Sequence, residues 1–175
     1  NEKWIVVDMG VTFADDSIPG IDLIMPDPGF IIDKKDDLLG IVLTHAHEDH
    51  IGAVAHIWPK LKCKLYATPF TAALLTEKFK EKKIDIASFL KIVPLNSKIK
   101  LGDFEIDFVT LTHSILEPNG LSIKTPLGTI LHTGDWKIDP NPLIGNKIDE
   151  EKLKKIGESG VSAMICDSTN IFNSG

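Results

Sequence analysis

Cysteine is scarce in this 175-residue sequence, which contains only Cys63 and Cys166. The two lie far apart and form no CxxC unit. Paired or closely spaced cysteines are the usual sign of a disulfide framework or a thiolate zinc site, so neither is indicated. We expect two buried thiols located in strands.

Long hydrophobic runs are also missing. No apolar stretch approaches the roughly 20 residues that a helix needs to cross a bilayer. The first ten residues, NEKWIVVDMG, lack the basic, apolar and small-residue order of a signal peptide. These two absences predict a cytoplasmic protein that does not associate with membranes.

An excess of positive charge is the third missing feature, because the formal net charge is -6 at pH 7. Proteins that bind nucleic acid usually carry a basic domain or stripe. The acidic balance therefore argues mildly against a polyanionic substrate. Bound divalent cations would reverse the local sign at a site, so the argument does not exclude phosphate chemistry.

Short apolar runs alternate with helical patterns along the chain. Runs rich in β-branched or aromatic residues predict buried strands at residues 4–7, 41–43, 64–67 and 161–165. Alternating residues at 104–109 predict a half-exposed antiparallel strand, and a TPLG turn divides residues 121–131 into two strand-like arms. Helices are expected at residues 49–57 with Pro59 as a stop, at 69–82 and at 149–156, and an ordered loop at 15–31. This order favours an α/β sandwich with the sheets inside and the helices outside.

The stretch LTHAHEDHIGAV, residues 43–54, concentrates ligand chemistry directly behind an apolar run. His45 and His47 are two positions apart, so an extended backbone places both imidazoles on one side, where they can share a metal ion. Asp49 and His50 follow at the expected helix start and suit a second ion. Imidazole and carboxylate ligands without thiolate fit zinc or manganese. The alternative is a run of surface histidines, which the specific HxHxDH pattern disfavours.

Further ligands are needed, because each ion requires at least three protein groups. His113 in VTLTHSILEPNG and Asp135 in ILHTGDWKID both end apolar runs. Functional groups collect where the strands of α/β sheets end, so these two are candidate ligands, against the alternatives of a capping histidine and a turn aspartate. We interpret His132 as packed or supporting a ligand, and His56 as a core or surface residue.

Four ordered motifs together resemble the metallo-β-lactamase superfamily: VVDMG, THAHEDH, VTLTH and HTGDW. The resemblance implies an αββα four-layer sandwich with two divalent metal ions between its sheets, zinc in the first place and manganese as the alternative. It implies a first ion bound by His45, His47 and His113, a second bound by Asp49 and His50, and Asp135 as a bridge between them. Asp8 of VVDMG matches a position that supports the ligand loop through hydrogen bonds without binding metal.

Within the superfamily, DDSIPGIDLIMPD, HTGDWKID and CDSTN resemble the β-CASP branch, and in particular the ribonuclease J group. Asp167 matches the acidic residue that opens the additional motifs of this branch, and is a catalytic candidate with Asp49 and Asp135. The resemblance implies hydrolysis of single-stranded RNA from the 5′ end, with endonuclease capacity, in RNA processing and decay. The two ions would lower the pKa of a bridging water so that hydroxide attacks the phosphodiester, oriented by Asp49.

Two other functions remain open. The same metal site could hydrolyse a small thioester or lactone, or the chain could be a non-catalytic metal-binding module. The group that the sequence resembles also has a β-CASP insertion, a second half of the sandwich with a further histidine, and a C-terminal domain, none of which this sequence contains. We therefore expect residues 1–175 to be one partial domain, inactive when isolated, of a longer protein that forms a homo-oligomer.

Overall fold

The computed structural model describes residues 2–169 and 171–172. The chain divides into two compact units, Asn1–Pro94 (unit 1) and Leu95–Gly175 (unit 2), and each is described by itself. None of the helices in the described part of the chain has the length and apolar character needed to cross a membrane.

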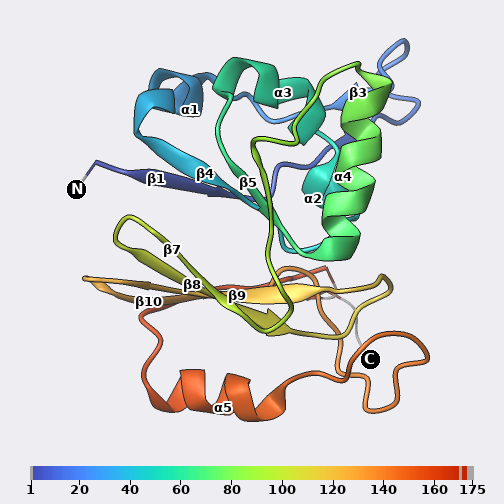
Figure 1. The fold of residues 1–175 in the computed structure, drawn as a ribbon. Coiled ribbons are helices and arrows are strands. Elements are labelled where there is room, and N and C mark those ends of the chain that lie inside the picture. The colour runs from blue at the N-terminus through green and yellow to red at the C-terminus, as the bar shows by residue number, and fades with distance from the viewer. Residues whose placement is uncertain (1, 170, 173–175) are drawn as a thin grey trace. The chain divides into compact units, whose positions relative to one another are not determined.

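Unit 1 is a parallel sheet with helices on one face (Figure 1). Its four strands lie in the order β1-β4-β5-β6, and every neighbouring pair is parallel. Parallel strands are buried on both faces and are therefore almost wholly apolar. The elements are β1 (Trp4–Val7), β2 (Thr12–Phe13), β3 (Leu23–Ile24), α1 (Gly29–Asp33), the 3-10 helix η1 (Lys35–Asp37), β4 (Leu38–Val42), α2 (Glu48–Ile51), α3 (Val54–Leu61), β5 (Leu65–Ala67), α4 (Pro69–Glu81) and β6 (Leu90–Ile92).

The expected helix at residues 49–57 is in fact two helices, α2 and α3, and Pro59 lies inside α3 instead of stopping it. The break follows from a tertiary contact, since the Ala53 amide donates to the Met9 carbonyl oxygen at 3.0 Å. Trp58 anchors the end of α3, because its ring nitrogen donates to the Cys63 carbonyl oxygen at 2.8 Å. Packing thus compensates for the one helical hydrogen bond that proline cannot make.

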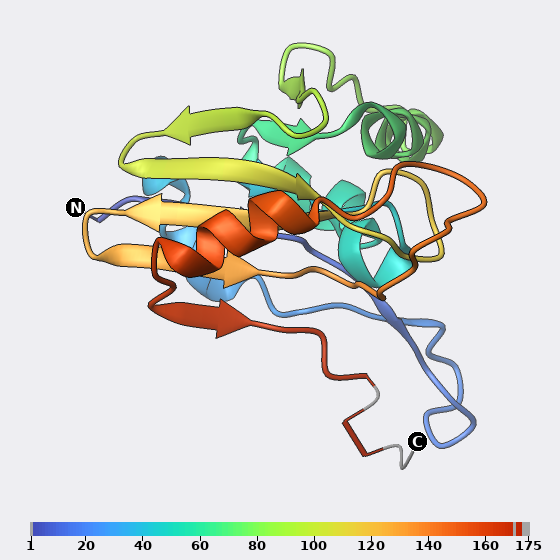
Figure 2. The same cartoon turned by 90° about the horizontal axis from the view of Figure 1, so that it is seen from below.

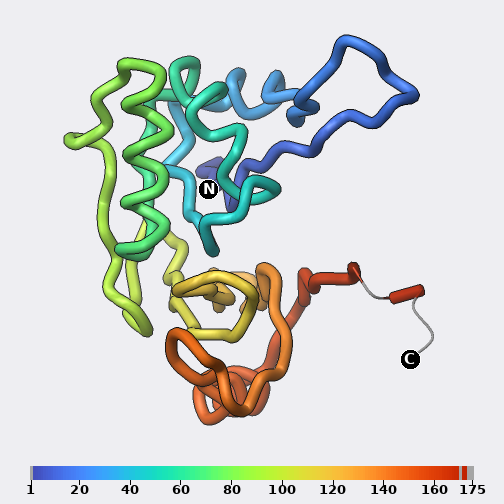
Figure 3. Tube along the Cα trace, turned by 90° about the vertical axis from the view of Figure 1, so that its right-hand side faces the viewer, coloured from blue at the N-terminus to red at the C-terminus, as the bar shows by residue number. Residues whose placement is uncertain are grey.

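The segment predicted as a loop, residues 15–31, contains β3 and the start of α1. β3 pairs antiparallel with β2 in a small separate hairpin. This hairpin extends away from the parallel sheet of unit 1 (Figure 3). Its apolar side chains, Phe13 and Ile18 among them, are exposed.

Unit 2 is a largely antiparallel sheet covered by one helix, α5 (Figure 2). The strand order is β11-β10-β9-β8-β7, with only the β10–β11 pair parallel. The predicted arms at residues 121–131 form the β9–β10 hairpin, so that prediction is confirmed. The elements are β7 (Lys98–Leu101), β8 (Phe104–Thr110), β9 (Asn119–Thr125), β10 (Gly128–His132), α5 (Glu150–Glu158) and β11 (Ala163–Ile165).

Two burial predictions are wrong. Residues 161–165 were expected to be buried, but β11 is an edge strand, and Met164 and Ile165 are 52% and 54% exposed. An edge strand has a neighbour on one side only, which an apolar sequence does not reveal. Cys166, directly after β11, is exposed, whereas Cys63 is buried but lies between α3 and β5 and not in a strand.

Candidate metal centre

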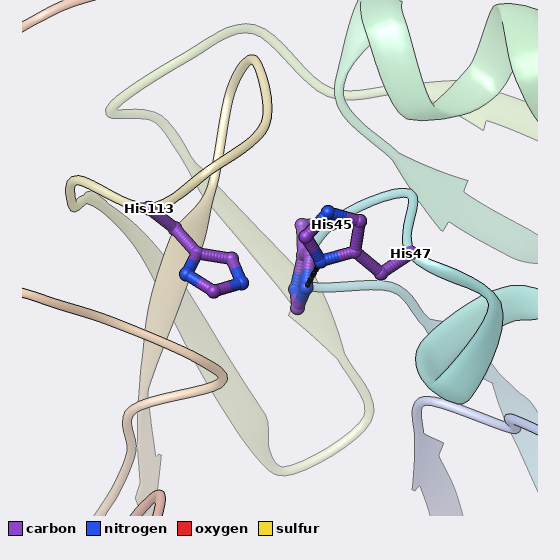
Figure 4. A group of neighbouring side chains, drawn as sticks. All are labelled: His45, His47 and His113. Carbon is purple, nitrogen blue, oxygen red and sulfur yellow. Dashed lines mark hydrogen bonds between the residues drawn. The ribbon is translucent and has the colours of Figure 1, made fainter. Parts of the chain in front are cut away.

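The loop after β4 brings two histidine rings together. His45 is fully buried, and His47 is the residue immediately before α2. The Nε2 atom of His45 lies 3.1 Å from the Nδ1 atom of His47. Figure 4 draws this pair with its dashed line, and also draws His113, which comes from the segment after β8 of unit 2.

The spacing of these two nitrogens fits a shared metal ligand pair. Two nitrogen atoms bonded to one zinc ion at about 2.1 Å lie roughly 3 to 3.4 Å apart when the bond angle is near tetrahedral or somewhat smaller. The observed 3.1 Å falls in that range. Because all ligands are imidazole and carboxylate groups, the donor set suits zinc and manganese alike.

The Asp8 carboxylate contacts the loop that carries the histidines through hydrogen bonds. Its Oδ1 atom accepts the Thr44 amide hydrogen at 2.8 Å. Its Oδ2 atom accepts from the Thr44 hydroxyl at 2.7 Å and lies 2.7 Å from the Nδ1 atom of His50. A carboxylate bonded to one ring nitrogen of a histidine orients the other nitrogen for a metal. The Asp8 carboxylate therefore contacts both Thr44 and His50 of the THAHEDH segment, and its expected supporting role at a metal stays a prediction.

Backbone hydrogen bonds join the VVDMG segment and the residue after it to α2. The Met9 amide donates to the His50 carbonyl oxygen at 2.7 Å, and the Val11 amide donates to the Glu48 carbonyl oxygen at 3.0 Å. Asp8 itself adopts a left-handed backbone conformation with φ of 57°. Aspartate and asparagine tolerate that conformation better than most residues, so the motif position favours a short polar side chain for backbone reasons as well.

Asp49 presents an exposed carboxylate beside His50. Its Oδ2 atom lies 3.7 Å from the Nε2 atom of His50, and its side chain is 65% exposed. The carboxylate and the imidazole face the same position from the start of α2. The expected role of Asp49 and His50 at one ion stays a prediction.

In unit 2, His113 and Asp135 lie close to each other. The Nε2 atom of His113 is 3.7 Å from the Oδ2 atom of Asp135. The loops that carry them are joined at Thr112, whose carbonyl oxygen accepts the Lys137 amide hydrogen at 2.8 Å and whose hydroxyl donates to the Lys137 carbonyl oxygen. The backbone of the GDW segment is thereby fixed beside His113.

Asp167 lies in the same part of unit 2. Its backbone amide donates to the Thr133 hydroxyl at 3.1 Å. Hydrogen bonds from the Thr169 amide and hydroxyl hold the pKa of the Asp167 carboxyl below its usual range, and the charge of His113 acts in the same direction. Asn170, the last residue of the predicted CDSTN motif, lies outside the described residues.

The two remaining histidines have supporting or surface positions. The Nδ1 atom of His132 accepts the Gly134 amide hydrogen at 3.0 Å, so His132 shapes the turn before Asp135. His56 is exposed on α3, with its Nδ1 atom 3.3 Å from the Lys82 ammonium. Burial and the charges of Lys82 and Lys78 lower the pKa of His56.

The predicted site residues form two groups, one in each unit. Asp8, His45, His47, Asp49 and His50 belong to unit 1, and His113, Asp135 and Asp167 belong to unit 2. Among these, His45, His47, His50, His113 and Asp135 can each offer a ligand atom to a metal ion. The sequence reasoning gave no role to Thr44, Thr112 and Thr133. Their positions, one or two residues before His45, His113 and Asp135, could have indicated a supporting role.

Comparison with known proteins places this site in a family. Residues 3–153 match the model of the beta-lactamase superfamily domain. Ribonuclease J of Sinorhizobium meliloti is 45% identical over 177 residues, covering 100% of this chain and 31% of that protein. Ribonuclease J of Helicobacter pylori is 41% identical over 172 residues, covering 98% of this chain and 25% of that protein. The chain therefore spans less than a third of the length of these curated relatives.

A solved structure shows the same fold. The crystal structure of the metallo-beta-lactamase fold protein YhfI from Bacillus subtilis is 16% identical, covers 77% of this chain and 51% of that chain, and superposes with a TM-score of 0.50. Likeness at this identity concerns the fold alone. It agrees with the mixed α/β architecture predicted from the motifs. The family match over residues 3–153 establishes that the chain belongs to the beta-lactamase superfamily, and its histidine and aspartate set supports the use of a divalent metal.

Proposed function

We propose that this chain supplies metal-binding residues to the active site of a ribonuclease of the ribonuclease J type. The observation that carries the proposal is the His45–His47 pair, whose facing nitrogens lie at a separation suited to one ion, on a loop fixed by Asp8. The 45% identity to a protein named ribonuclease J supports RNA over a small ester as the substrate class.

The ligand assignment follows the order of the motifs in the family. We assign His45, His47 and His113 to one ion, Asp49 and His50 to a second ion, and Asp135 to both. Zinc is our first choice for the metal and manganese the alternative, because both accept imidazole and carboxylate ligands. The support for this assignment is the sequence pattern and the orientation of each residue within its own unit.

The chain's own residues have separate tasks in this proposal. When bound, the ions would supply Lewis acidity for the activation of water and the neutralisation of charge on the phosphoryl oxygens. The exposed carboxylate of Asp49 accepts a hydrogen bond from the attacking water and aims it at phosphorus. Asp8 keeps the Nδ1 atom of His50 engaged. Hydrogen bonds from Thr169 lower the pKa of the Asp167 carboxyl and so keep it ionised.

Several features of the longer protein follow from the same proposal. The substrate is single-stranded RNA, cut from the 5′ end or internally, and the protein acts in the cytoplasm as a homo-oligomer. The names of the relatives support the RNA substrate. We expect the isolated chain to be inactive by itself.

The test uses the longer protein that contains this chain, with end-labelled single-stranded RNA and added zinc or manganese. The double variant His45→Ala/His47→Ala should lose at least about 100-fold of the cleavage rate, because the metal loses two ligands. His56→Ala is the matched control, an exposed histidine of the same unit, and should cleave normally. Unchanged cleavage by the double variant, or turnover of a thioester or lactone with none of RNA, would contradict the proposal.

A further inference from the structure

The hydroxyl group of Thr44 lies where hydrogen bonds from Asp8, His45 and His50 meet. Thr44 has no exposed surface. Its amide donates to Asp8 Oδ1 at 2.8 Å, and its hydroxyl donates to Asp8 Oδ2 at 2.7 Å. Because one carboxylate holds this residue at two points, the direction of the hydroxyl is fixed.

That direction determines which nitrogen of His45 carries hydrogen. The Nδ1 atom of His45 lies 3.0 Å from the Thr44 hydroxyl oxygen. A hydroxyl has one hydrogen, and here it is directed to Asp8, so toward His45 the oxygen acts as an acceptor and Nδ1 must be the donor. In a neutral imidazole the other nitrogen then has a lone pair. That nitrogen is Nε2, the atom that faces His47.

The same contacts determine the hydrogen position of His50. Its Nδ1 atom lies 2.7 Å from Asp8 Oδ2 and 3.4 Å from the Thr44 hydroxyl oxygen. A carboxylate oxygen that already accepts from Thr44 can only accept from His50 as well, so Nδ1 of His50 carries hydrogen. In the neutral ring its Nε2 atom, which lies 3.7 Å from Asp49 Oδ2, then has the lone pair.

We propose that Thr44 is a positioning residue: its hydroxyl, together with Asp8, selects the ring tautomers of His45 and His50 that present Nε2 to a divalent cation. The inference rests on the proposed function only in taking a metal ion as the ligand. Its physical basis is that a histidine binds metal through a lone pair, and that the partner of its other nitrogen decides which atom has one.

Thr71 is a suitable control, because it is a buried threonine whose hydroxyl does not contact a histidine. It is as fully buried as Thr44, in the same unit, on α4. Its hydroxyl contact is with the hydroxyl of Thr68 at 3.5 Å. Replacement of Thr71 by valine therefore reports the effect of losing a buried hydroxyl as such, with no histidine or carboxylate partner involved.

The experiment compares Thr44→Val, Thr44→Ser and Thr71→Val in the full chain. Long-range proton–nitrogen NMR of the histidine rings, recorded without metal at mildly alkaline pH, should show hydrogen on Nδ1 of His45 and His50 in the unchanged chain and in Thr44→Ser. In Thr44→Val, His45 should lose this preference and shift toward the Nε2-protonated form. Competition with a chromogenic chelator should show zinc binding about 10 to 100-fold weaker for Thr44→Val. Thr44→Ser and Thr71→Val should stay within a few-fold of the unchanged chain.

Two failures can be told apart. If the unchanged chain binds no zinc, the metal part of the proposed function fails, while the ring spectra still test the role of Thr44. If the chain binds zinc and Thr44→Val binds it equally well with the same His45 tautomer, the positioning role is wrong. If Thr44→Val and Thr71→Val lost zinc affinity equally, without a tautomer change, the loss would come from altered packing. That result would also overturn the proposal.

Discussion

Gly10, the last residue of the VVDMG segment, packs directly against the backbone of α2. A Cβ atom at this position would lie 1.7 Å from the Asp49 carbonyl oxygen. No real side-chain carbon approaches a backbone oxygen so closely, so any larger residue must push α2 away from the VVDMG segment. Glycine is required here for steric reasons, because any side chain would collide with the backbone of Asp49, a proposed metal ligand.

We expect Gly10→Ala to lower the free energy of unfolding by roughly 1 to 3 kcal/mol or more, because overpacking forces the backbone to shift. Zinc affinity should fall as well, since Asp49 and His50 move with α2. Gly157→Ala is the control: it lies in α5 with nothing within 4 Å of the added carbon. It should gain about 0.5 to 1 kcal/mol from higher helix propensity. Urea unfolding of both variants measures the difference, and a neutral Gly10→Ala would contradict the described contact.

The two thiols should differ sharply in reactivity. Burial raises the pKa of the Cys63 thiol to about 11, above its ordinary value, so it stays protonated at moderately alkaline pH. The thiolate is the reactive form, and Cys166 is exposed. A disulfide reagent should therefore label one thiol quickly in the folded chain and both after denaturation. Replacement of Cys166 by serine should remove the fast phase; two fast phases in the folded chain would mean that Cys63 is accessible.

At the scale of elements, Lys152 links α5 to β8, in addition to the Asp149 amide, which donates to the Thr110 carbonyl oxygen at 3.0 Å. The Lys152 ammonium lies 2.5 Å from Asp107 Oδ1 and donates to the Phe108 carbonyl oxygen at 2.8 Å. Both side chains of the ion pair are mostly buried. The neighbouring Lys154 on the same helix is 79% exposed and lies 4.0 Å from Glu158.

Lys152→Met should cost about 1.5 to 3 kcal/mol of stability, because the mostly buried Asp107 carboxylate loses its nearest charged hydrogen-bond donor and keeps only Lys98, whose side chain is 74% exposed. Lys154→Met should change stability by less than about 1 kcal/mol, since exposed ion pairs contribute little. Hydrogen exchange of the β8 amides, read with urea unfolding, checks both. Similar losses in the two variants would show that α5 is not held by the Lys152–Asp107 contact.

The same elements show what the sequence could and could not predict. The strand at residues 4–7, the β9–β10 hairpin and α4 were predictable because local apolar patterns, turn residues and Pro69 specify them. The positions of the ligand candidates after β4, β8 and β10 were predictable because each follows an apolar run, whereas their binding of metal stays a prediction. The break between α2 and α3 and the exposure of β11 were not, since both depend on contacts or missing neighbours distant in the chain. The role of Thr44 was hidden for the same reason, as its carboxylate partner is Asp8.

At the scale of the whole molecule, the two sheets differ in how far apart their paired strands lie in sequence. In unit 1, Val7 pairs with Val42 and Leu65 with Leu90, in parallel register. In unit 2, tight turns join Leu101 to Phe104 and Thr125 to Gly128. Closing a long chain segment costs more conformational entropy than closing a short one.

This difference predicts an order of events during folding. Hairpins form in about 1 to 10 μs, whereas parallel pairing must wait for distant segments to meet. We expect the amide hydrogens of β9 and β10 to gain protection before those of β1 and β4 when the denatured chain is diluted into buffer and pulse-labelled with deuterium. Lengthening the turn at residues 126–127 with glycines should delay protection in unit 2, with little effect on unit 1. Earlier protection of β1 would mean that the parallel sheet organises the chain first, and the histidine loop that follows β4 would then be among the earliest parts of the molecule to take shape.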